Sequence, residues 1–427
     1  MGSRYTGPMD DNTENMQAAQ MTERAFAPFP LGPITLPNRF IKAAANENMS
    51  RKGAPTRAMQ LHHAELARGG VGMTTMAYLA VEKAGITLPD QVWLHDDVLP
   101  DLRAVTDAVH REGGKICAQI THGGSFVTGV FMPRRLQSSV SGFNPAGLLR
   151  GNFLRRAMTL ADMDRMVDLF VAAAERCVAA GFDAVEIHMG HGYLLNQFIS
   201  PMDNNRRDQF GGSAANRVRF PARVLEAVKA AVGSRIAVLA KINVTDGRSR
   251  GASIEDGVIT AQALEAAGAD MLVLSAGRNV ESGWMTFGSN MNLDAMLRVL
   301  GKYSLSGMAI AATARTAPKV DFRELYLLEY SRQIRAAVSL PLAYLGGVKS
   351  LENVRTVLGE GFDAVAMARA LLREPELVNQ WREQPEQPSL CDNCNSCVAY
   401  IYHPGGTWCI HRPPNRLEDN RVLASAS

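Results

Sequence analysis

The segment AAGFDAVEIH (179–188) ends a helical run at a glycine and passes through an aspartate into a short apolar stretch. AAGADMLVLS (266–275) and GEGFDAVAMA (359–368) repeat this arrangement. The glycine stands where a helix commonly ends in a left-handed residue. Short apolar runs without polar alternation are typical of parallel strands that are buried on both faces. Each of the three segments therefore predicts the end of a helix followed by a buried strand.

Apolar runs of the same kind recur along the chain, which gives eight candidate strands in total. Helical patterns separate most of them, at 101–112, 160–180, 216–232, 253–267, 323–338 and 351–358. This alternation predicts an α/β fold, a (β/α)8 TIM barrel. The alternative is an open doubly wound sheet, which would normally carry a G-x-G-x-x-G turn after its first strand, and none is present. The five further runs are FIKAAA (40–45), GVGMTTMA (70–77), KICAQI (115–120), IAVLAKI (236–242) and LPLAYLG (340–346).

Composition and charge exclude several classes of protein. Lys+Arg 45 against Asp+Glu 42 leaves a net charge of +3, too balanced to favour nucleic acid or a membrane as partner. The sequence has no apolar run long enough for a membrane span and no apolar secretion signal at its start. We therefore expect a cytoplasmic protein with a small-molecule substrate. The expected parts are a leader (1–24), disordered or an artificial extension, a barrel (25–385), a Cys-rich segment (386–415) and a flexible tail (416–427).

Polar side chains follow most of the predicted strands, and in a TIM barrel these strand ends form the active site. His188 ends one strand, and His191 and Tyr193 follow in the next loop. Two neutral imidazoles can hold a carbonyl or nitro oxygen, while a phenol gives a proton to the adjacent carbon. Two alternatives stay open: a zinc site, although no third ligand at helical spacing accompanies the histidines, or two structural histidines. The strand-end residues are Asn46, Glu47, Gln119, His122, His188, His191, Lys241, Asn243 and Arg369.

The last two predicted strands end in small residues that precede helices. Gly346–Gly347 follows one strand and Ala368–Arg369 follows the next. Small residues let backbone N–H groups approach a phosphate closely, and the arginine adds positive charge. The sequence therefore predicts a phosphate-bearing cofactor or substrate at this part of the barrel.

Together these residues resemble a known family. HMGHGYLLNQFISPMDNNRRDQFGGSAANRVRF (188–220) is similar to the signature of the Old Yellow Enzyme family of FMN-dependent oxidoreductases. The resemblance extends from LGPITLPNRFIKAA (31–44) through GKICAQITHGG (114–124) and VLAKINVTDG (238–247) to the last strand, so that it covers about residues 26 to 410.

The resemblance implies FMN as cofactor, NADH or NADPH as electron donor and specific roles for individual residues. His188 and His191 match the pair that binds the substrate oxygen, and Tyr193 matches the proton donor. Gln119 and Lys241 match residues at the flavin pyrimidine ring. The sequence departs from the family pattern at two places: Ala44–Ala45–Asn46 stands where many relatives have Pro-x-Thr, and His122–Gly123–Gly124 lacks the usual arginine. The remaining flavin contacts implied are Ala44, Ala45 and Ala77, with Gly346, Gly347, Ala368 and Arg369 at the phosphate.

Four of the six cysteines fall in CDNCNSCVAYIYHPGGTWC (391–409), with the spacing C-x2-C-x2-C-x11-C. Without a secretion signal, such a group indicates a metal or cluster site more than a set of disulfides. The segment is similar to that of trimethylamine dehydrogenase and 2,4-dienoyl-CoA reductase, which implies a 4Fe–4S cluster. Structural zinc and thiols without any metal stay open as alternatives. The four candidate ligands are Cys391, Cys394, Cys397 and Cys409.

The sequence thus predicts an FMN-dependent, ene-reductase-like enzyme that reduces activated C=C bonds with NAD(P)H. One rival is a flavin-dependent dehydrogenase or demethylase that oxidises an amine or a saturated carbonyl compound. A rival from another class is a non-catalytic barrel that binds a phosphorylated ligand. The physiological substrate, the choice between NADH and NADPH, and whether the protein is a homo-oligomer stay open.

Overall fold

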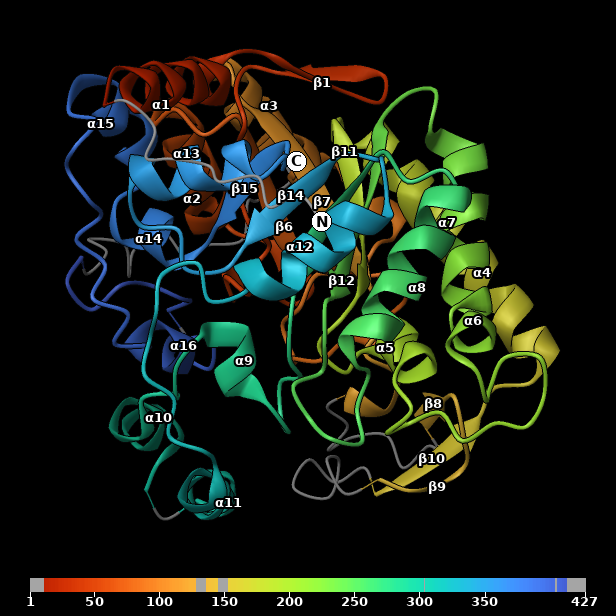
Figure 1. The fold of residues 1–427 in the computed structure, drawn as a ribbon. Helices are drawn as coiled ribbons and strands as arrows, with labels where there is room; N and C mark the ends of the chain where they lie inside the picture. Colours follow the sequence, from red (N-terminus) through yellow and green to blue (C-terminus); the bar gives the residue numbers. More distant parts are fainter. Residues whose placement is uncertain (1–10, 128–135, 145–152, 303, 404, 413–427) are drawn as a thin grey trace, which may run out of the picture.

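Eight parallel strands close into a barrel at the centre of the molecule (Figure 1). The computed structural model describes residues 11–127, 136–144, 153–302, 304–403 and 405–412. Each strand coincides with one of the apolar runs in the sequence, so the predicted TIM barrel is confirmed. Neighbouring strands pair in parallel around the closed ring. In chain order the strands are β3 (Phe40–Lys42), β6 (Met73–Ala80), β7 (Lys115–Thr121), β11 (Ala184–Met189), β12 (Ala237–Asn243), β13 (Met271–Ser275), β14 (Leu342–Leu345) and β15 (Ala364–Met367).

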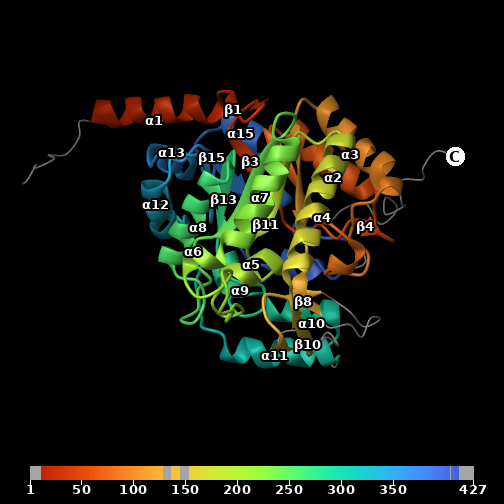
Figure 2. The same cartoon turned by 90° about the vertical axis from the view of Figure 1, so that its right-hand side faces the viewer.

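Helices surround the barrel and bury one apolar face each against it (Figure 2). Two of them begin with a capping box, Thr159 with Asp162 and Ser253 with Asp256, which satisfies backbone N–H groups at the helix start. The helix predicted at 323–338 begins later, at Leu328. The surrounding helices are α2 (Arg57–Arg68), α3 (Leu99–Arg111), α4 (Leu160–Ala179), α7 (Arg219–Val232), α8 (Ile254–Ala266), α12 (Leu328–Ala337), α13 (Leu351–Gly359), α14 (Arg369–Arg373) and α15 (Leu377–Glu383).

The registers of β7, β11 and β12 set the site. Glu186 on β11 stands beside Gln119 on β7, and His188 stands beside Lys241 on β12. Side chains two residues apart on a strand point to the same face, so these polar groups enter the same side of the barrel. Apolar residues, among them Ala184, Leu239 and Met271, fill the interior below them. The barrel thus has a packed lower half and a polar upper end.

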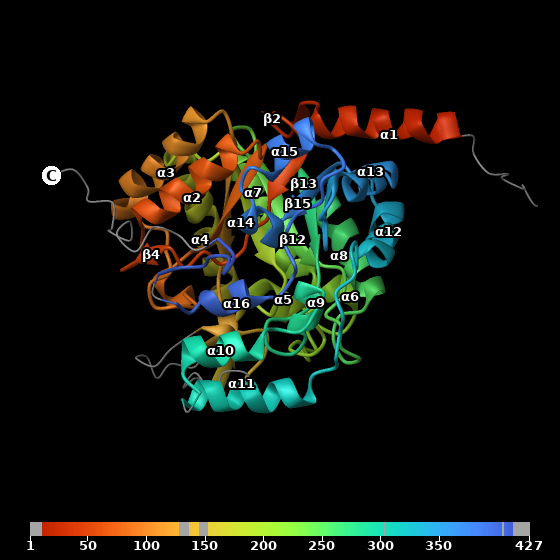
Figure 3. The same cartoon turned by 90° about the vertical axis from the view of Figure 1, so that its left-hand side faces the viewer.

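The N-terminal segment differs from the prediction of a disordered leader. Residues Asp11–Phe26 form helix α1, which runs past the barrel (Figures 2 and 3). Its last turn is anchored: the Arg24 guanidinium donates to the carbonyl oxygens of Leu358 (2.8 Å) and Phe362 (3.2 Å), and Ala25 is fully buried. These partners are more than 330 residues away in the sequence, which is why composition alone missed the helix. The predicted tail 416–427 and residues 1–10 lie outside the described residues.

Additional elements gather at the end of the barrel where the strands terminate. The segment between β13 and β14 forms α9 (Gly283–Phe287), α10 (Leu293–Leu300) and α11 (Leu305–Thr316), and α10 packs against α16 (Ser396–Tyr400) of the Cys-rich segment (Figure 3). In the described part of the chain, no helix combines the length and the apolar run that a bilayer span requires. The remaining elements are β1 (Phe29–Leu31), β2 (Ile34–Leu36), β4 (Ser50–Arg51), β5 (Ala54–Pro55), the 3₁₀ turns Lys83–Gly85, Asp96–Val98 and Gly124–Phe126, β8 (Leu136–Ser138), β9 (Gly142–Phe143), β10 (Leu154–Ala157), α5 (Leu194–Ile199) and α6 (Ala214–Arg217).

Candidate functional site

A large cavity opens at the carboxyl ends of the strands. Its wall combines the loops after β3, β6, β11, β14 and β15 with parts of α9, α10 and the Cys-rich segment. Most of the residues predicted from the sequence line it, whereas His188, Gln119, Ala77, Cys394 and Cys409 are not in its wall. The predicted residues that line it are Ala44, Ala45, His191, Tyr193, Lys241, Gly346, Gly347, Ala368, Arg369, Cys391 and Cys397.

A buried ion pair lies at the floor of the cavity. The Lys241 Nζ is 3.2 Å from Glu186 Oε1, and the two side chains are 1% and 2% exposed. Gln119 Nε2 donates to the same carboxylate at 2.6 Å, while Lys241 also donates to the carbonyl oxygen of Ala44 at 3.4 Å. The Gln119 Oε1 has no hydrogen-bond partner among the described residues. Lys241 lines the cavity, whereas Glu186 and Gln119 do not, so the floor presents a cation that is held by two buried side chains.

A second buried charge pair, Lys42 with Glu47, lies beside the first. The Lys42 ammonium contacts the Glu47 carboxylate and donates to the carbonyl oxygen of Thr75 at 3.0 Å. Burial lowers the pKa of Lys42, and burial raises the pKa of Glu47. The Ala77 N–H donates to Glu47 Oε2 at 3.1 Å. That N–H group therefore already has a partner, which limits the flavin contact that the family resemblance implies for Ala77.

His188, His191 and Tyr193 form one compact corner of aromatic rings. The His188 ring centre is 5.0 Å from that of His191 and 4.8 Å from that of Tyr193. His191 Nε2 is 2.8 Å from the Ser275 hydroxyl. The Tyr193 hydroxyl is within hydrogen-bonding distance, 2.8 Å, of the Tyr78 hydroxyl. The three predicted residues therefore meet, and Tyr78 joins them, although no feature of the sequence had singled it out.

Both histidines are neutral in this environment. Burial lowers the pKa of His191 to about 3, with the Lys241 charge as a second cause. Burial likewise lowers the pKa of His188 far below its ordinary value, and the neighbouring His191 adds to this. The Gly190 N–H points at His188 Nδ1 at 3.4 Å, which makes Nδ1 the acceptor and leaves the proton on Nε2. In the described part of the chain, neither histidine belongs to a group of three possible metal ligands.

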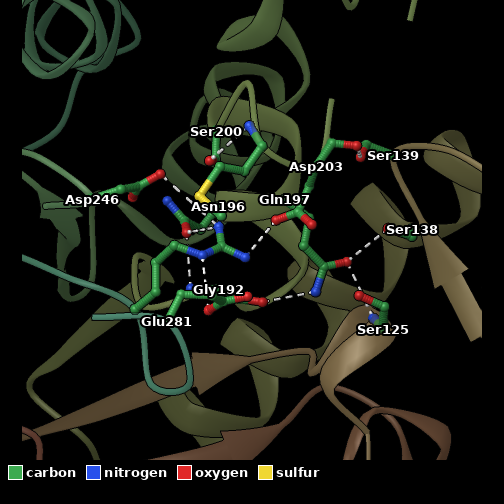
Figure 4. A network of polar contacts seen from close by, with 12 residues as sticks. Ser125, Ser138, Ser139, Gly192, Asn196, Gln197, Ser200, Asp203, Asp246 and Glu281 are labelled. Carbon is green, nitrogen blue, oxygen red and sulfur yellow. Dashed lines mark hydrogen bonds and ion pairs between the residues drawn. The ribbon is translucent and has the colours of Figure 1, made fainter. Parts of the chain in front are cut away.

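The signature residues that follow Tyr193 hold the loop in place. Asn196 Oδ1 accepts the Gly192 N–H at 2.8 Å, and Gln197 Nε2 donates to the Gly192 carbonyl at 2.8 Å. Gln197 Oε1 in turn accepts from the Ser125 N–H and the Ser138 hydroxyl (Figure 4). His191 has φ +59, a left-handed conformation that costs energy in a residue other than glycine. The network therefore keeps a strained turn in a single geometry.

A salt-bridge network around Arg278 holds the same loop through Asn196. The Arg278 guanidinium is 4% exposed, contacts Asp203 Oδ2 at 2.6 Å and donates to Asn196 Oδ1 at 3.3 Å. Burial opposes the charge of Arg278, but Asp203, Glu281 and Asp246 outweigh it and raise the pKa of the guanidinium. Figure 4 draws the Asp203, Asp246 and Glu281 carboxylates around this part of the loop.

Two glycines after β14 form the turn for which a phosphate site was predicted. Gly346 and Gly347 have φ of +152 and +77, and a Cβ on Gly347 would lie 2.9 Å from the Leu325 backbone nitrogen. Larger residues are therefore excluded from this turn. Arg369 donates to the Phe287 carbonyl at 2.8 Å and also contacts the Asn395 side chain. Arg369 thus links β15, the segment after β13 and the Cys-rich segment at one end of the cavity.

The four cysteines of the Cys-rich segment lie near one another as free thiols. Burial raises the pKa of Cys397 to about 12, and Cys391, Cys409 and Cys394 are all close enough to influence it. Zinc holds four thiolate sulfurs about 3.8 Å apart, given a Zn–S bond of about 2.3 Å. Among the described residues, the only group of three possible ligands within 4.8 Å of one another is Asp392, Cys394 and His411. Among the described residues, no three of the four sulfurs lie within 4.8 Å of one another.

The fold and the cavity define a TIM barrel with a partly cationic binding site at its mouth. The sequence profile of the NADH:flavin oxidoreductase / NADH oxidase family matches residues 24–284. The chain belongs to this family and is an FMN-dependent oxidoreductase, as the resemblance to Old Yellow Enzyme implied.

The chain is similar to several individual members of this family. It is 39% identical over 394 residues to a 4,4'-dithiodibutanoate disulfide reductase from Rhodococcus erythropolis, which covers 92% of this chain and 96% of that one. It is 29% identical to a multifunctional alkene reductase/demethylase from Caballeronia cordobensis over 93% of this chain, but spans only 55% of that protein. An Old Yellow Enzyme homologue from Zymomonas mobilis has the same fold, with a TM-score of 0.67 at 22% identity over 88% of this chain and 98% of that one.

The neutrality of the two imidazoles gives a testable prediction. Their pKa values lie below the ordinary 6.5 of an unfolded histidine, so the unfolded chain binds more protons as the pH falls from 6.5 toward 3. The stability that each neutral imidazole allows is therefore lost in that window. In NMR spectra of ¹⁵N-histidine-labelled protein at pH 5, we expect neutral-imidazole signals for His188 and His191, identified by their loss in His188→Asn and His191→Asn; burial also lowers the pKa of His63, so a further neutral imidazole should remain in both variants. Imidazolium shifts for either residue at pH 5 would contradict the burial argument.

Proposed function

We propose that this enzyme reduces activated C=C bonds, such as those of enones, with NADH or NADPH as electron donor. The observation that carries the proposal is the corner of His188, His191 and Tyr193 beside a cationic cavity floor. Membership of an FMN-dependent family supports it and weighs against the non-catalytic phosphate-binding barrel.

The residues of the cavity fit FMN. The cation of Lys241 in the cavity wall suits the pyrimidine end of a flavin, where negative charge collects on reduction. The Gln119 side chain lies outside that wall, and its amide oxygen, which has no partner among the described residues, is proposed to accept an N–H of the same ring. The glycine turn and Arg369 suit its phosphate. When bound, FMN supplies hydride transfer from the nicotinamide to the acceptor. The residues proposed to hold FMN are Ala44, Ala45, Ala77, Gln119, Lys241, Gly346, Gly347, Ala368 and Arg369, with Ala77 offering no free N–H.

The aromatic corner would bind and protonate the acceptor. A neutral imidazole can donate one N–H without bringing a full positive charge, and His188 carries its proton on Nε2. Together His188 and His191 would hold the oxygen of the electron-withdrawing group and draw electron density from the double bond. Tyr193 would give its hydroxyl proton to the carbon next to that group. The loop network keeps the three side chains in register while this happens.

Two other acceptors or donors remain candidates for the same site. Reduction of an organic disulfide is favoured by the 39% identity to a disulfide reductase along nearly the whole of both chains. Oxidation of an amine or a saturated carbonyl compound is favoured by the 29% identity to a multifunctional alkene reductase/demethylase. This chain spans 55% of that relative. A disulfide leaves as thiolate and needs no protonation at carbon, which separates it from an alkene.

For the Cys-rich segment we propose a 4Fe–4S cluster held by Cys391, Cys394, Cys397 and Cys409. A cubane binds four thiolates at its corners, which four cysteines in one short segment can supply, and among its described residues no three of their sulfurs lie as close as 4.8 Å, whereas zinc would bring them to about 3.8 Å. Cys391 and Cys397 line the same cavity as Tyr193, so the cluster would lie beside the flavin. Structural zinc and free thiols are the competing outcomes.

Replacing Tyr193 by Phe tests the alkene proposal. Flavin bleaching by NAD(P)H should be unchanged, because that half-reaction needs no proton from Tyr193. Reoxidation of the reduced enzyme by cyclohexenone should slow by roughly 10²-fold, the usual size of general acid catalysis. Stopped-flow absorbance follows both half-reactions. Equal loss of the two half-reactions would remove Tyr193 from the donor role, and fast reoxidation by 4,4'-dithiodibutanoate with none by cyclohexenone would favour the disulfide.

Metal analysis tests the cluster proposal. Protein purified without oxygen should contain about four iron and four sulfide per chain, and Cys397→Ser should lose most of the iron. Cys177→Ser is a matched control, since Cys177 is a buried cysteine far from the segment in sequence. One zinc per chain with no iron would contradict the cluster, as would iron content that survives Cys397→Ser.

A further inference from the structure

Tyr78 stands next to the proposed proton donor and has no role assigned so far. It lies in β6 and lines the cavity. Its hydroxyl oxygen is 2.8 Å from that of Tyr193. Its ring stacks on His188, with centres 6.1 Å apart and planes at 29°, and meets the Tyr193 ring edge-on at 5.4 Å. Tyr78 therefore touches both the donor and one of the two oxygen-binding imidazoles.

The position of Tyr78 is fixed by its surroundings. Gln91 Nε2 donates to the Tyr78 carbonyl at 2.9 Å, and Gln91 Oε1 accepts the Thr87 N–H at 2.7 Å. The backbone of Tyr78 is thus tied to the loop that follows β6. The ring is held separately by its contacts with His188 and Tyr193, so the side chain loses little further freedom when its hydroxyl makes a hydrogen bond.

In the structure the Tyr193 hydroxyl donates to the Tyr78 hydroxyl oxygen, and loss of the Tyr193 proton would reverse this direction. When Tyr193 gives its proton to the acceptor, its oxygen becomes a phenolate that needs a donor. A hydrogen bond to an ionised oxygen is shorter and about twice as strong as one between neutral groups. Burial raises the pKa of Tyr78 well above its ordinary value, with Tyr193 as the next cause, so Tyr78 keeps its proton and can donate.

We propose that Tyr78 is a positioning residue that donates its hydroxyl hydrogen to the Tyr193 oxygen as Tyr193 protonates the acceptor. In this step the Tyr193 O–H bond breaks, a C–H bond forms on the acceptor, and the negative charge left on Tyr193 is held by the Tyr78 hydroxyl until water restores the proton. The inference rests on the proposed function, in which Tyr193 is the acid and the reduced cofactor supplies the hydride. Tyr78 makes Tyr193 a stronger acid.

Tyr78→Phe tests this, because it keeps the ring contact with His188 and removes only the hydroxyl. The pKa of Tyr193, followed by NMR of ¹³Cζ-tyrosine-labelled protein, should rise by about one unit, and reoxidation by cyclohexenone should slow about tenfold. The high-pH limb of that rate should move upward with the pKa, while the cyclohexenone concentration at half-maximal rate changes less than twofold. Tyr330→Phe on α12, outside the cavity wall, is the matched control and should change none of these.

Several results would overturn the inference. A slower rate with an unmoved Tyr193 pKa and pH limb would leave Tyr78 as packing only. 3-Fluorotyrosine at position 78 preserves the shape of the side chain and makes its hydroxyl a stronger donor, so it should move the high-pH limb of the reoxidation rate to lower pH. This variant replaces Tyr78→Phe as the test if Tyr78→Phe does not fold. A Tyr193→Phe enzyme that reduces cyclohexenone normally would refute the proposed function. A slow Tyr193→Phe with a normal Tyr78→Phe would refute only the role of Tyr78.

Discussion

The site depends on a charge pair that the barrel would not need for folding. Lys241 and Glu186 lie 3.2 Å apart with side chains almost wholly buried, and removing two charges from water costs several kcal/mol per ion before their attraction offsets it. The interior beneath them is filled by apolar residues, both large and small, such as Leu239, Met271 and Ala184, so the charges are confined to the upper end of the barrel. Only the lysine end of the pair reaches the cavity wall. The barrel therefore stabilises a cation where a bound group with developing negative charge would meet it.

The family signature after β11 serves structure more than chemistry. Tyr193 and His191 reach the cavity, whereas Asn196 and Gln197 bind the backbone of Gly192 and hold the turn. The later part of the signature works in the same way. Arg206 donates to the carbonyl oxygens of Ser139 and Met158, Asn204 to those of Phe198 and Phe210, and Arg217 to those of Ile199 and Gly212. Of these bonds, those of Asn196 and Gln197 to Gly192 lie directly beside the left-handed His191, whose conformation is disfavoured on its own.

The barrel could be predicted because its elements have local sequence signals. Each strand coincides with an apolar run, and several helices show helical periodicity that ends at a glycine. The place of the candidate site could be predicted as well, because a parallel barrel brings the carboxyl ends of its strands to one end. Features that depend on distant partners could not be predicted in this way. Helix α1 is anchored by the carbonyl groups of Leu358 and Phe362. The Ala77 N–H is bound by Glu47. Tyr78 is part of the candidate site through its contact with Tyr193, which lies more than 100 residues later in the sequence. Glu186 lies within an apolar strand, and an acidic residue in such a place indicates a buried partner. The sequence does not say which residue that partner is.

A crystal structure of the protein saturated with FMN tests the central claim most directly. The account predicts flavin density across the mouth of the barrel, with its phosphate at Gly346, Gly347 and Arg369, its pyrimidine end against Lys241 and Gln119, and its hydride-carrying face toward His191 and Tyr193. Density for FMN anywhere else, or a cavity that stays free of flavin at saturating FMN, would contradict it.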